Sequence, residues 1–305
     1  MPVADAQIGQ AEPCSGDALV LCGGGGHGAL EVGFAQALED LGVGYDRILG
    51  TSIGALNGAF LAAGMSPADL ASSWCTARLW RLVRPNWRWL LHPRAQPGLL
   101  SLSALRRFLH HALPVRQFED LKIPLVIVTT DLATGKACYW EDEGDIIGPL
   151  LASMSLPGIF PPITLNGHPH IDGGIADNAP LGRAMDLGHC RALMIECACA
   201  SPCRRPPMGL IGILGRSFEI ALARKHRADL ALQAEGIDVI RIVPRLEDEP
   251  GFLGLSASQS LIEAARGQSL SELPKLLAHR ECPAGSEDRE VAATHPAVKE
   301  AAEAQ

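Results

Sequence analysis

The sequence lacks the features that would place the protein across a membrane or outside the cell. No apolar run reaches the ~20 residues that span a bilayer, because Asn57, Gly58 and Gly64 interrupt the most apolar stretch, residues 55–65. Residues 1–17 carry no positive charge and no long apolar run, so they lack the pattern of a secretory signal peptide. We therefore expect a cytoplasmic protein that could touch membranes peripherally.

Basic residues are also scarce, with 26 Lys and Arg against 34 Asp and Glu and a formal net charge of −8. Nucleic-acid binding needs a basic face, so we expect no nucleic-acid partner. The 305 residues, 47% of them hydrophobic, are enough for one large core. We place a single domain at residues 17–280, between a flexible N-terminus at 1–16 and an acidic, alanine-rich tail at 281–305 that we expect to be disordered.

The nine cysteines contain no CxxC pair. An odd number without a signal peptide indicates reduced thiols. Four of them are close in sequence and raise the alternative of a metal site: Cys190, Cys197, Cys199 and Cys203. Two of the four lie in an apolar run, residues 192–200, that reads as a buried strand, where cysteine behaves as a small hydrophobe. We favour that interpretation and expect no metal.

Strand and helix patterns alternate along the chain. The pattern predicts strands at residues 18–22, 45–49, 125–130, 136–140, 192–197 and 237–243, and a hairpin turn at Asn166-Gly167. It predicts helices at residues 29–41, 53–63, 67–82, 102–112, 146–154, 181–187, 209–233 and 257–277, with residues 84–101 irregular. This alternation predicts an α/β fold, with helices on both faces of a mostly parallel sheet.

A glycine-rich turn follows the first predicted strand and opens the first helix. Taken alone, Gly23-x-Gly25-x-x-Gly28 is a dinucleotide-binding fingerprint, but that motif expects an acid at the end of the second strand. Here the only acid of that strand, Asp46, lies at its start. The alternatives are a plain tight turn or an oxyanion hole, whose backbone N–H groups would come from Gly23, Gly24, Gly25, Gly26, His27 and Gly28.

A second motif selects the oxyanion hole. Gly50-Thr51-Ser52-Ile53-Gly54 is a G-x-S-x-G pentapeptide between a predicted strand and a predicted helix, the context of a nucleophile elbow. The flanking glycines Gly50 and Gly54 leave room for the sharp turn. Ser52 would stand at the N-terminus of the helix, where the helix dipole favours developing negative charge.

A serine nucleophile needs a base. The late histidines at positions 189, 226, 279 and 295 lack the glycine- or proline-rich loops typical of a triad histidine. The stronger candidate is Asp172, which ends a predicted strand and is followed by Gly173 and Gly174. Asp131 and Asp177 are weaker alternatives, since turn aspartates commonly cap local backbone.

In this order the three motifs resemble the patatin-like phospholipase family, in its bacterial type with a single patatin domain. The similarity covers about residues 19–244 and includes Ala55-Leu56-Asn57-Gly58, Ile123-Pro124-Leu125, Thr130-Asp131-Leu132, Pro157-Gly158-Ile159-Phe160-Pro161-Pro162 and Asp177-Asn178 with Pro180. It departs at His27, where the family usually has Arg or Lys. We expect His27 to pack beside the loop; a slower or more pH-dependent enzyme is the alternative.

The resemblance implies a three-layer sandwich and a serine lipid acyl hydrolase: a phospholipase A, a lysophospholipase or an esterase. It implies that Asp172 takes the Ser52 proton directly, that amides near Gly25 and Gly26 hold the oxyanion, and that water releases the acyl group. No cofactor is implied. Acyl transfer to an alcohol shares the first half-reaction and stays an alternative, as do a dinucleotide-binding protein and an inactive scaffold.

Residues 70–118 contain no acid but eight arginines and four of the five tryptophans. Arginine with tryptophan is typical of surfaces that bind anionic lipid. We expect a small helical cap or substrate entrance here, with Trp80, Arg84, Trp87, Arg88 and Trp89 at the membrane or the entrance. The alternative is that the tryptophans pack in the core and the arginines pair with acids elsewhere.

Overall fold

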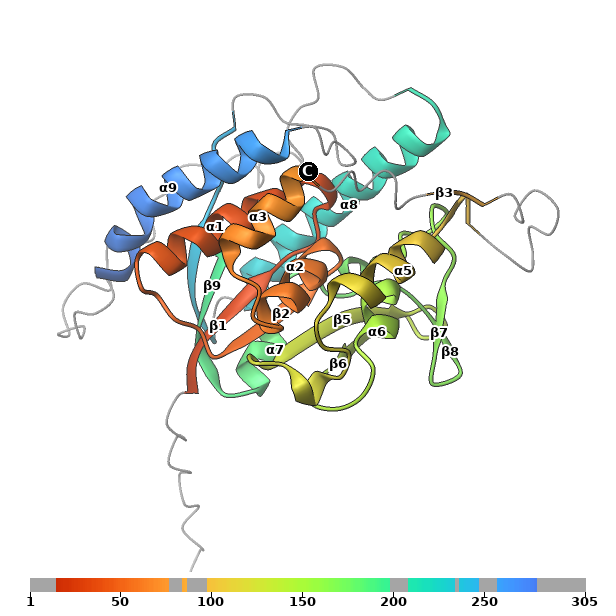
Figure 1. The fold of residues 1–305 in the computed structure, drawn as a ribbon, viewed down its shortest axis with the longest axis horizontal. Coiled ribbons are helices and arrows are strands. Elements are labelled where there is room, and N and C mark those ends of the chain that lie inside the picture. The colour runs from red at the N-terminus through yellow and green to blue at the C-terminus, as the bar shows by residue number, and fades with distance from the viewer. Residues whose placement is uncertain are drawn as a thin grey trace, which may run out of the picture.

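The computed structural model describes residues 15–76, 84–86, 98–197, 208–233, 236–246 and 257–278. Its centre is an eight-stranded sheet in the order β10-β9-β1-β2-β5-β8-β7, with β6 paired to β5 (Figure 1). β10, β9, β1, β2 and β5 are parallel, and β6, β7 and β8 are antiparallel. These strands are β1 (Ser15–Leu21), β2 (Arg47–Thr51), β5 (Leu125–Asp131), β6 (Ala137–Trp140), β7 (Ile163–Leu165), β8 (His168–Asp172), β9 (His189–Ile195) and β10 (Asp238–Ile242).

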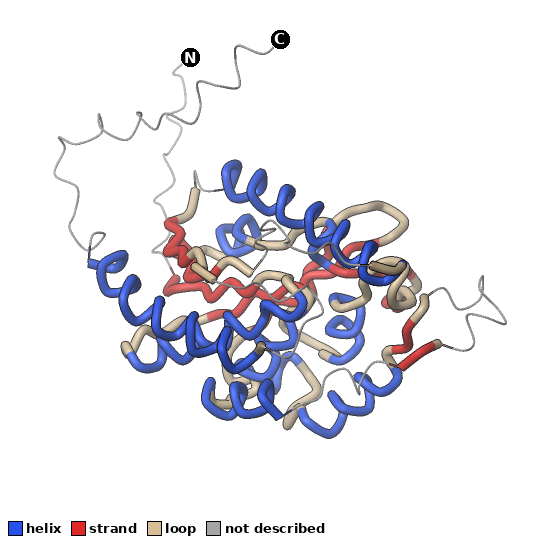
Figure 2. The backbone as a smooth tube through the Cα atoms, turned by 90° about the horizontal axis from the view of Figure 1, so that it is seen from above, coloured by secondary structure: helices blue, strands red, loops and turns tan. Residues whose placement is uncertain are grey.

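Helices cover both faces of the sheet, as Figure 2 shows, so the predicted α/β class is confirmed. One face carries α1 (Gly28–Asp40), α2 (Ile53–Ala62), α3 (Pro67–Thr76), α5 (Ser103–Ala112), α6 (Ile147–Ser153) and α9 (Ser258–Ala278). The other carries α7 (Leu181–Asp186) and α8 (Leu210–Gln233). Short 3₁₀ turns at Gly25–His27, Phe118–Asp120 and Gly173–Ile175 complete the described helical elements.

The burial of β1 on both faces explains why apolar and polar residues do not alternate in its sequence. Leu19 and Leu21 pack in the core beneath α1 and α2, whereas Ala18 and Val20 pack in the core beneath α7 and α8. All four are fully buried, because side chains alternate between the two faces of a strand and both faces are covered here. An apolar run in this position therefore indicates a central strand of a three-layer fold.

Two findings differ from expectation. Residues 84–101 were expected to be irregular, but their described parts form a two-stranded antiparallel sheet of β3 (Arg84–Pro85) and β4 (Leu100–Ser101). The cysteines were expected to be reduced, and Cys22, Cys75, Cys138 and Cys197 are thiols, but Cys190 is disulfide-bonded.

Two features are absent from the described residues. None of the helices in those ranges is both long and apolar enough to cross a membrane. The same residues contain no cluster of three His, Cys, Asp or Glu side chains that could hold a metal ion. Cys199 and Cys203, two members of the predicted cysteine cluster, lie outside the described ranges.

Candidate active site

The register of the sheet brings Ser52 and Asp172 together. Val128 of β5 pairs with both Thr51 and Tyr139, and Thr129 pairs with both Cys138 and Asp172. A strand has only two edges, so β6 occupies one edge of β5 while β2 and β8 share the other. Because β2 and β8 run in opposite directions, their carboxyl ends meet at this point.

The two side chains are in direct contact across that junction. The Ser52 hydroxyl donates a hydrogen bond to Asp172 Oδ2 at 2.7 Å. The two residues are 120 positions apart in the sequence. Ser52 is 8% exposed and Asp172 is fully buried, so the pair lies in a site that is largely shielded from water.

The backbone of Ser52 is strained, with φ 55° and ψ −120°. This combination is uncommon for any residue other than glycine and typically marks a functional turn. Neighbouring glycines permit the turn: a Cβ on Gly54 would lie 2.3 Å from the Leu21 carbonyl oxygen, and one on Gly50 would lie 2.6 Å from Ala55 Cα. The predicted elbow context, strand β2 followed by helix α2, is confirmed.

Burial shifts the acidity of Asp172. Desolvation raises the pKa of this carboxyl from 3.8 to about 7, against the opposing effect of hydrogen bonds from Ser52 and Gly174. The Gly174 amide donates to Asp172 Oδ1 at 2.9 Å. A Cβ on Gly173 would meet the Val128 carbonyl oxygen at 2.2 Å, so only glycine lets the chain turn here against β5.

The glycine-rich loop lies beside the nucleophile. A Cβ added to Gly23 would be 3.1 Å from Ser52 Cβ. Three of the loop's amides donate within the protein: Gly23 to Asn178 Oδ1, His27 to the Gly24 carbonyl and Gly28 to the Gly25 carbonyl. Among the residues that the structure describes, these bonds leave the amides of Gly24, Gly25 and Gly26 for a ligand.

His27, where the sequence departs from the family pattern, is 3% exposed. Its Nδ1 lies 3.2 Å from the Gly24 carbonyl oxygen, so the ring contacts the loop that it belongs to. Its Nε2 is buried and has no hydrogen-bond partner within the described part of the chain. The imidazole therefore fills space beneath the loop.

The weaker candidate bases have other contacts. Asp131 Oδ1 accepts hydrogen bonds from the amides of Ala133 and Thr134 at 2.7 and 3.3 Å and so caps a turn. Asp177 Oδ2 accepts one from the Tyr139 hydroxyl at 2.8 Å. Within the described ranges, the carboxylate hydrogen bonds of Asp172 go to Ser52 and Gly174, so no described histidine orients it.

The four late histidines do not form a triad in the described part of the chain. His189 Nδ1 lies 2.8 Å from the Gly16 carbonyl oxygen, at the amino end of β1 and far along the strand from the loop. His226 is buried in α8, where desolvation lowers its pKa. His279 and His295 lie outside the described residues.

The dinucleotide alternative fails because the acid of the second strand lies at the wrong end of that strand. Asp46 precedes β2, and its amide donates to the Asp17 carbonyl near the start of β1. A ribose-binding acid must instead stand where the second strand ends, next to the glycine loop.

The predicted membrane or entrance residues are mostly outside the described ranges. This holds for Trp80, Trp87, Arg88 and Trp89. Arg84 is described and exposed in β3. Trp74, from the same basic stretch, is buried and donates from Nε1 to Asn57 Oδ1 at 2.8 Å, so this tryptophan belongs to the core.

Sequence reasoning did not assign two contacts that hold the site. The Asn178 side chain accepts from the Gly23 amide at 2.9 Å and donates to the Gly23 carbonyl at 3.3 Å, which ties the glycine loop to the segment after Asp172. The Ser153 hydroxyl accepts from the Ser52 amide at 2.8 Å. Asn178 did stand in a recognised motif, but Ser153 at the end of α6 carried no local signal.

Comparisons with known proteins identify the family to which the chain belongs. Residues 19–185 match the family model described as patatin-like phospholipase, which is more than half of the chain. The protein therefore belongs to the patatin-like phospholipase family, and the resemblance seen in the sequence is confirmed.

Curated relatives include patatin-like phospholipase domain-containing protein 6 of Homo sapiens, 34% identical over 184 residues, 59% of this chain and 13% of that one. Neuropathy target esterase sws of Drosophila melanogaster is 32% identical over 182 residues, 58% of this chain and 12% of that one. The chain thus matches only about an eighth of the length of these relatives. Among solved structures, VipD from Legionella pneumophila covers 90% of this chain and 69% of its own with a TM-score of 0.48 and 15% identity.

Proposed function

We propose that the protein is a serine lipid acyl hydrolase, a phospholipase A, lysophospholipase or related esterase, with Ser52 as nucleophile and Asp172 as its base. The observation that carries this proposal is the 2.7 Å hydrogen bond from the Ser52 hydroxyl to a buried carboxylate, on a strained turn at a helix N-terminus. Membership of the patatin-like phospholipase family supports lipid esters as the substrate class.

The geometry supports a two-step mechanism. Asp172 Oδ2 takes the Ser52 proton as Oγ attacks the ester carbonyl, and the carbonyl oxygen becomes an oxyanion. The free amides of Gly24, Gly25 and Gly26 hold that oxyanion, and each such donor typically contributes ~100–1,000-fold in rate. Collapse of the tetrahedral intermediate breaks the ester C–O bond, and Asp172 returns the proton to the leaving alcohol. Water, deprotonated by Asp172, then releases the acyl group from Ser52.

The acidity of Asp172 suits this role. A base is most effective when its pKa lies near the working pH, and burial has brought this carboxyl to about 7. An ordinary aspartate, with a pKa near 3.9, is a far weaker acceptor for a hydroxyl proton. The neutral donors around Asp172 orient it without lowering its pKa as strongly as a nearby cation would.

The test combines a fluorophosphonate probe with phospholipid and lysophospholipid vesicles. We expect the probe to label one peptide, identified by mass spectrometry as the one that contains Ser52, and fatty acid to be released from the vesicles. Ser52→Ala removes both signals. Fatty-acid release that survives in Ser52→Ala, or a label on another serine, contradicts the proposal.

We also propose that the N-terminal turns of α8 contact the lipid surface. Met208, Leu210 and Ile213 are 91%, 64% and 54% exposed, an unusual cluster for a monomer surface. This end of α8 projects from the body of the protein in Figure 1. Further along α8, Phe218 packs on Leu156 and Ile159, in the loop that precedes the hairpin carrying Asp172. If this apolar end of α8 contacts lipid, it brings the candidate active site close to the lipid surface.

Flotation with anionic and neutral liposomes tests this surface. We expect the double variant Leu210→Asp/Ile213→Asp to lose most of the liposome-bound fraction, because two charges would enter the interface. The matched control is Leu270→Asp, on α9, whose leucine is also exposed. Equal binding by the double variant and the wild-type protein rejects the docking proposal.

A further inference from the structure

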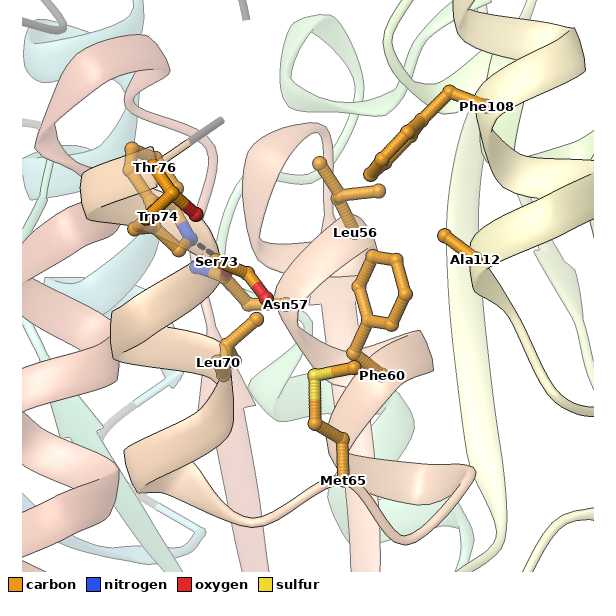
Figure 3. A pocket seen from close by; sticks show the side chains of 10 residues that line it. All are labelled: Leu56, Asn57, Phe60, Met65, Leu70, Ser73, Trp74, Thr76, Phe108 and Ala112. Atoms are coloured by element: carbon orange, nitrogen blue, oxygen red, sulfur yellow. Dashed lines mark hydrogen bonds between the residues drawn. The ribbon is translucent and has the colours of Figure 1, made fainter. Parts of the chain in front are cut away.

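A cavity of about 290 Å³ lies between three helices, one of which, α2, has Ser52 as its N-cap. Figure 3 shows α2 between the walls, with α3 on one side and α5 on the other. The side chains that line it are Leu56, Asn57, Phe60, Met65, Leu70, Ser73, Trp74, Thr76, Phe108 and Ala112. α3 and α5 are also the helices that flank the basic, tryptophan-rich segment in the sequence.

The cavity follows the helix that begins at the nucleophile. Ser52 is the N-cap of α2, and Leu56 and Phe60 stand four and eight residues further along. Residues spaced by four lie on one side of a helix, so the three share a face. Met65, which also lines the cavity (Figure 3), follows the carboxyl end of α2, whereas Ser52 precedes its amino end.

Seven of the ten lining side chains are apolar, and two of the three polar ones, Asn57 and Thr76, are hydrogen-bonded within the protein. The Asn57 amide donates to the Gly28 carbonyl and Glu31 Oε2 and accepts from Trp74 Nε1. The Thr76 hydroxyl donates to the Ser72 carbonyl at 2.8 Å. These polar groups are satisfied by the protein itself, so the space suits an apolar ligand and offers little to a charged one.

The distance along α2 from the nucleophile to Phe60 in the lining indicates the size of that ligand. Eight residues of helix, from Ser52 to Phe60, rise about 12 Å. An extended alkyl chain with C–C bonds of about 1.5 Å advances ~1.25 Å per carbon and covers this distance with roughly ten carbons. A longer chain would meet Met65.

We propose that this cavity binds the acyl chain of the ester and gives the enzyme a preference for straight chains of about ten carbons. The inference rests on the proposed function, because it places the carbonyl carbon of that chain at Ser52. The chain enters beside Ser52, lies along Leu56 and Phe60, and ends against Met65.

A series of p-nitrophenyl esters from acetate to palmitate tests the preference. We expect kcat/KM to rise by up to about fourfold per added methylene until roughly ten carbons and then to stop rising. Ser73→Phe, which places a ring in the cavity, should lower the ratio of kcat/KM for decanoate over acetate by at least tenfold. The matched control is Ser72→Phe on the exposed side of α3, which should leave that ratio unchanged.

Shortening the side chain of Met65, at its end of the cavity, gives an independent readout. Met65→Ala should move the preferred length upward by two to four carbons, which a merely destabilised protein would not do. Thermal unfolding of each variant, followed by circular dichroism, shows whether it is folded.

A binding measurement separates failure of this inference from failure of the proposed function. Sodium decanoate is titrated into the Ser52→Ala protein by calorimetry, and we expect binding that Ser73→Phe weakens and Ser72→Phe does not. Ser52-dependent hydrolysis with no chain-length preference, or with a preference that Ser73→Phe does not change, overturns the acyl-site inference and leaves the hydrolase standing. Absence of any Ser52-dependent hydrolysis, with decanoate still bound and displaced as expected, overturns the hydrolase but keeps an apolar-chain site.

Discussion

The carboxylate of Asp17, near the amino end of the parallel strands, is held in the opposite way to those of Asp172 and Glu31 near the carboxyl end. At the amino end, Asp17 of β1 faces Arg191 of β9, and the guanidinium donates two hydrogen bonds to the carboxylate at 2.7 and 2.6 Å. At the carboxyl end, Asp172 and Glu31 are buried and are held by neutral donors such as Ser52 and Asn57. Desolvation raises the pKa of Asp172 to about 7 and of Glu31 to about 8.

The difference separates a structural role from a chemical one. An aspartate with an arginine partner keeps its charge and is a poor proton acceptor, whereas a desolvated aspartate holds a proton more tightly and can exchange it near neutral pH. The same desolvation opposes folding when the carboxyl is charged. In the proposed mechanism the desolvation of Asp172 therefore costs stability and makes the carboxyl a better proton acceptor, and the following predictions test that contrast.

The largest effect concerns activity. Asp172→Asn should lower kcat by about 10⁴-fold, because the amide cannot accept the Ser52 proton; losses of this order follow removal of a base in serine hydrolases. Asp17→Asn, the same change at the amino end, should leave kcat within about twofold. Ester hydrolysis by both purified variants measures this. Similar losses in both would mean that the change harms the fold and not the chemistry.

The second effect concerns stability against pH. The folded protein keeps the Asp172 proton up to a pH of about 7, but the unfolded chain loses it near 3.8. Stability from this group is thus present at low pH and is lost as the pH rises through this window, by up to about 1.4 kcal/mol per pH unit. The free energy of unfolding of Asp172→Asn, minus that of the wild type, should increase from pH 5 to pH 8 in urea titrations.

Asp131→Asn is the control for that measurement. The Ala133 amide lowers the pKa of Asp131, so its contribution is complete above the unfolded value and is lost only at lower pH. The difference between this variant and the wild type should change much less from pH 5 to pH 8, because the neighbouring His168, 3.6 Å from Asp131 Oδ2, is mostly exposed and contributes little. A change as small for Asp172→Asn would show that this carboxyl is not desolvated.

A smaller effect comes from the strained elbow. Glycine adopts the Ser52 backbone angles without strain and alanine does not, so Ser52→Gly should be more stable than Ser52→Ala by about 1 kcal/mol. Both variants remove the hydroxyl, so their comparison isolates the backbone. Equal unfolding midpoints would contradict the strain at φ 55°.

The smallest effect lies at the amino end. Arg191→Leu should lower the free energy of unfolding by about 1 kcal/mol or less, because this pair is partly exposed. The loss should shrink in 1 M salt, which screens such pairs. A loss of several kcal/mol would contradict a modest structural role for the Asp17–Arg191 ion pair.

Much of the site could be predicted from the sequence because its chemistry is local. The elbow around Ser52 and the glycine loop each occupy a few consecutive residues, with glycines that the structure explains by close backbone contacts. The α/β class followed from alternating patterns for the same reason.

Longer-range features could not be predicted in this way. The contact between Ser52 and Asp172 depends on β2 and β8 sharing one edge of β5, which is a matter of register and not of motif. The Ser52 amide meets the Ser153 hydroxyl across 101 residues. The cavity between α2, α3 and α5 depends on helix packing, and no spacing in the sequence encodes its volume.

The most direct test of the central claim is the pH dependence of inactivation by an uncharged fluorophosphonate. The reagent reports attack by Ser52 without a later hydrolytic step. The wild-type rate should rise through a single ionisation with a midpoint near 7, the pKa of Asp172, and Asp172→Asn should react far more slowly and lose that ionisation. An unchanged midpoint in Asp172→Asn would contradict the account, since another group would then be the base.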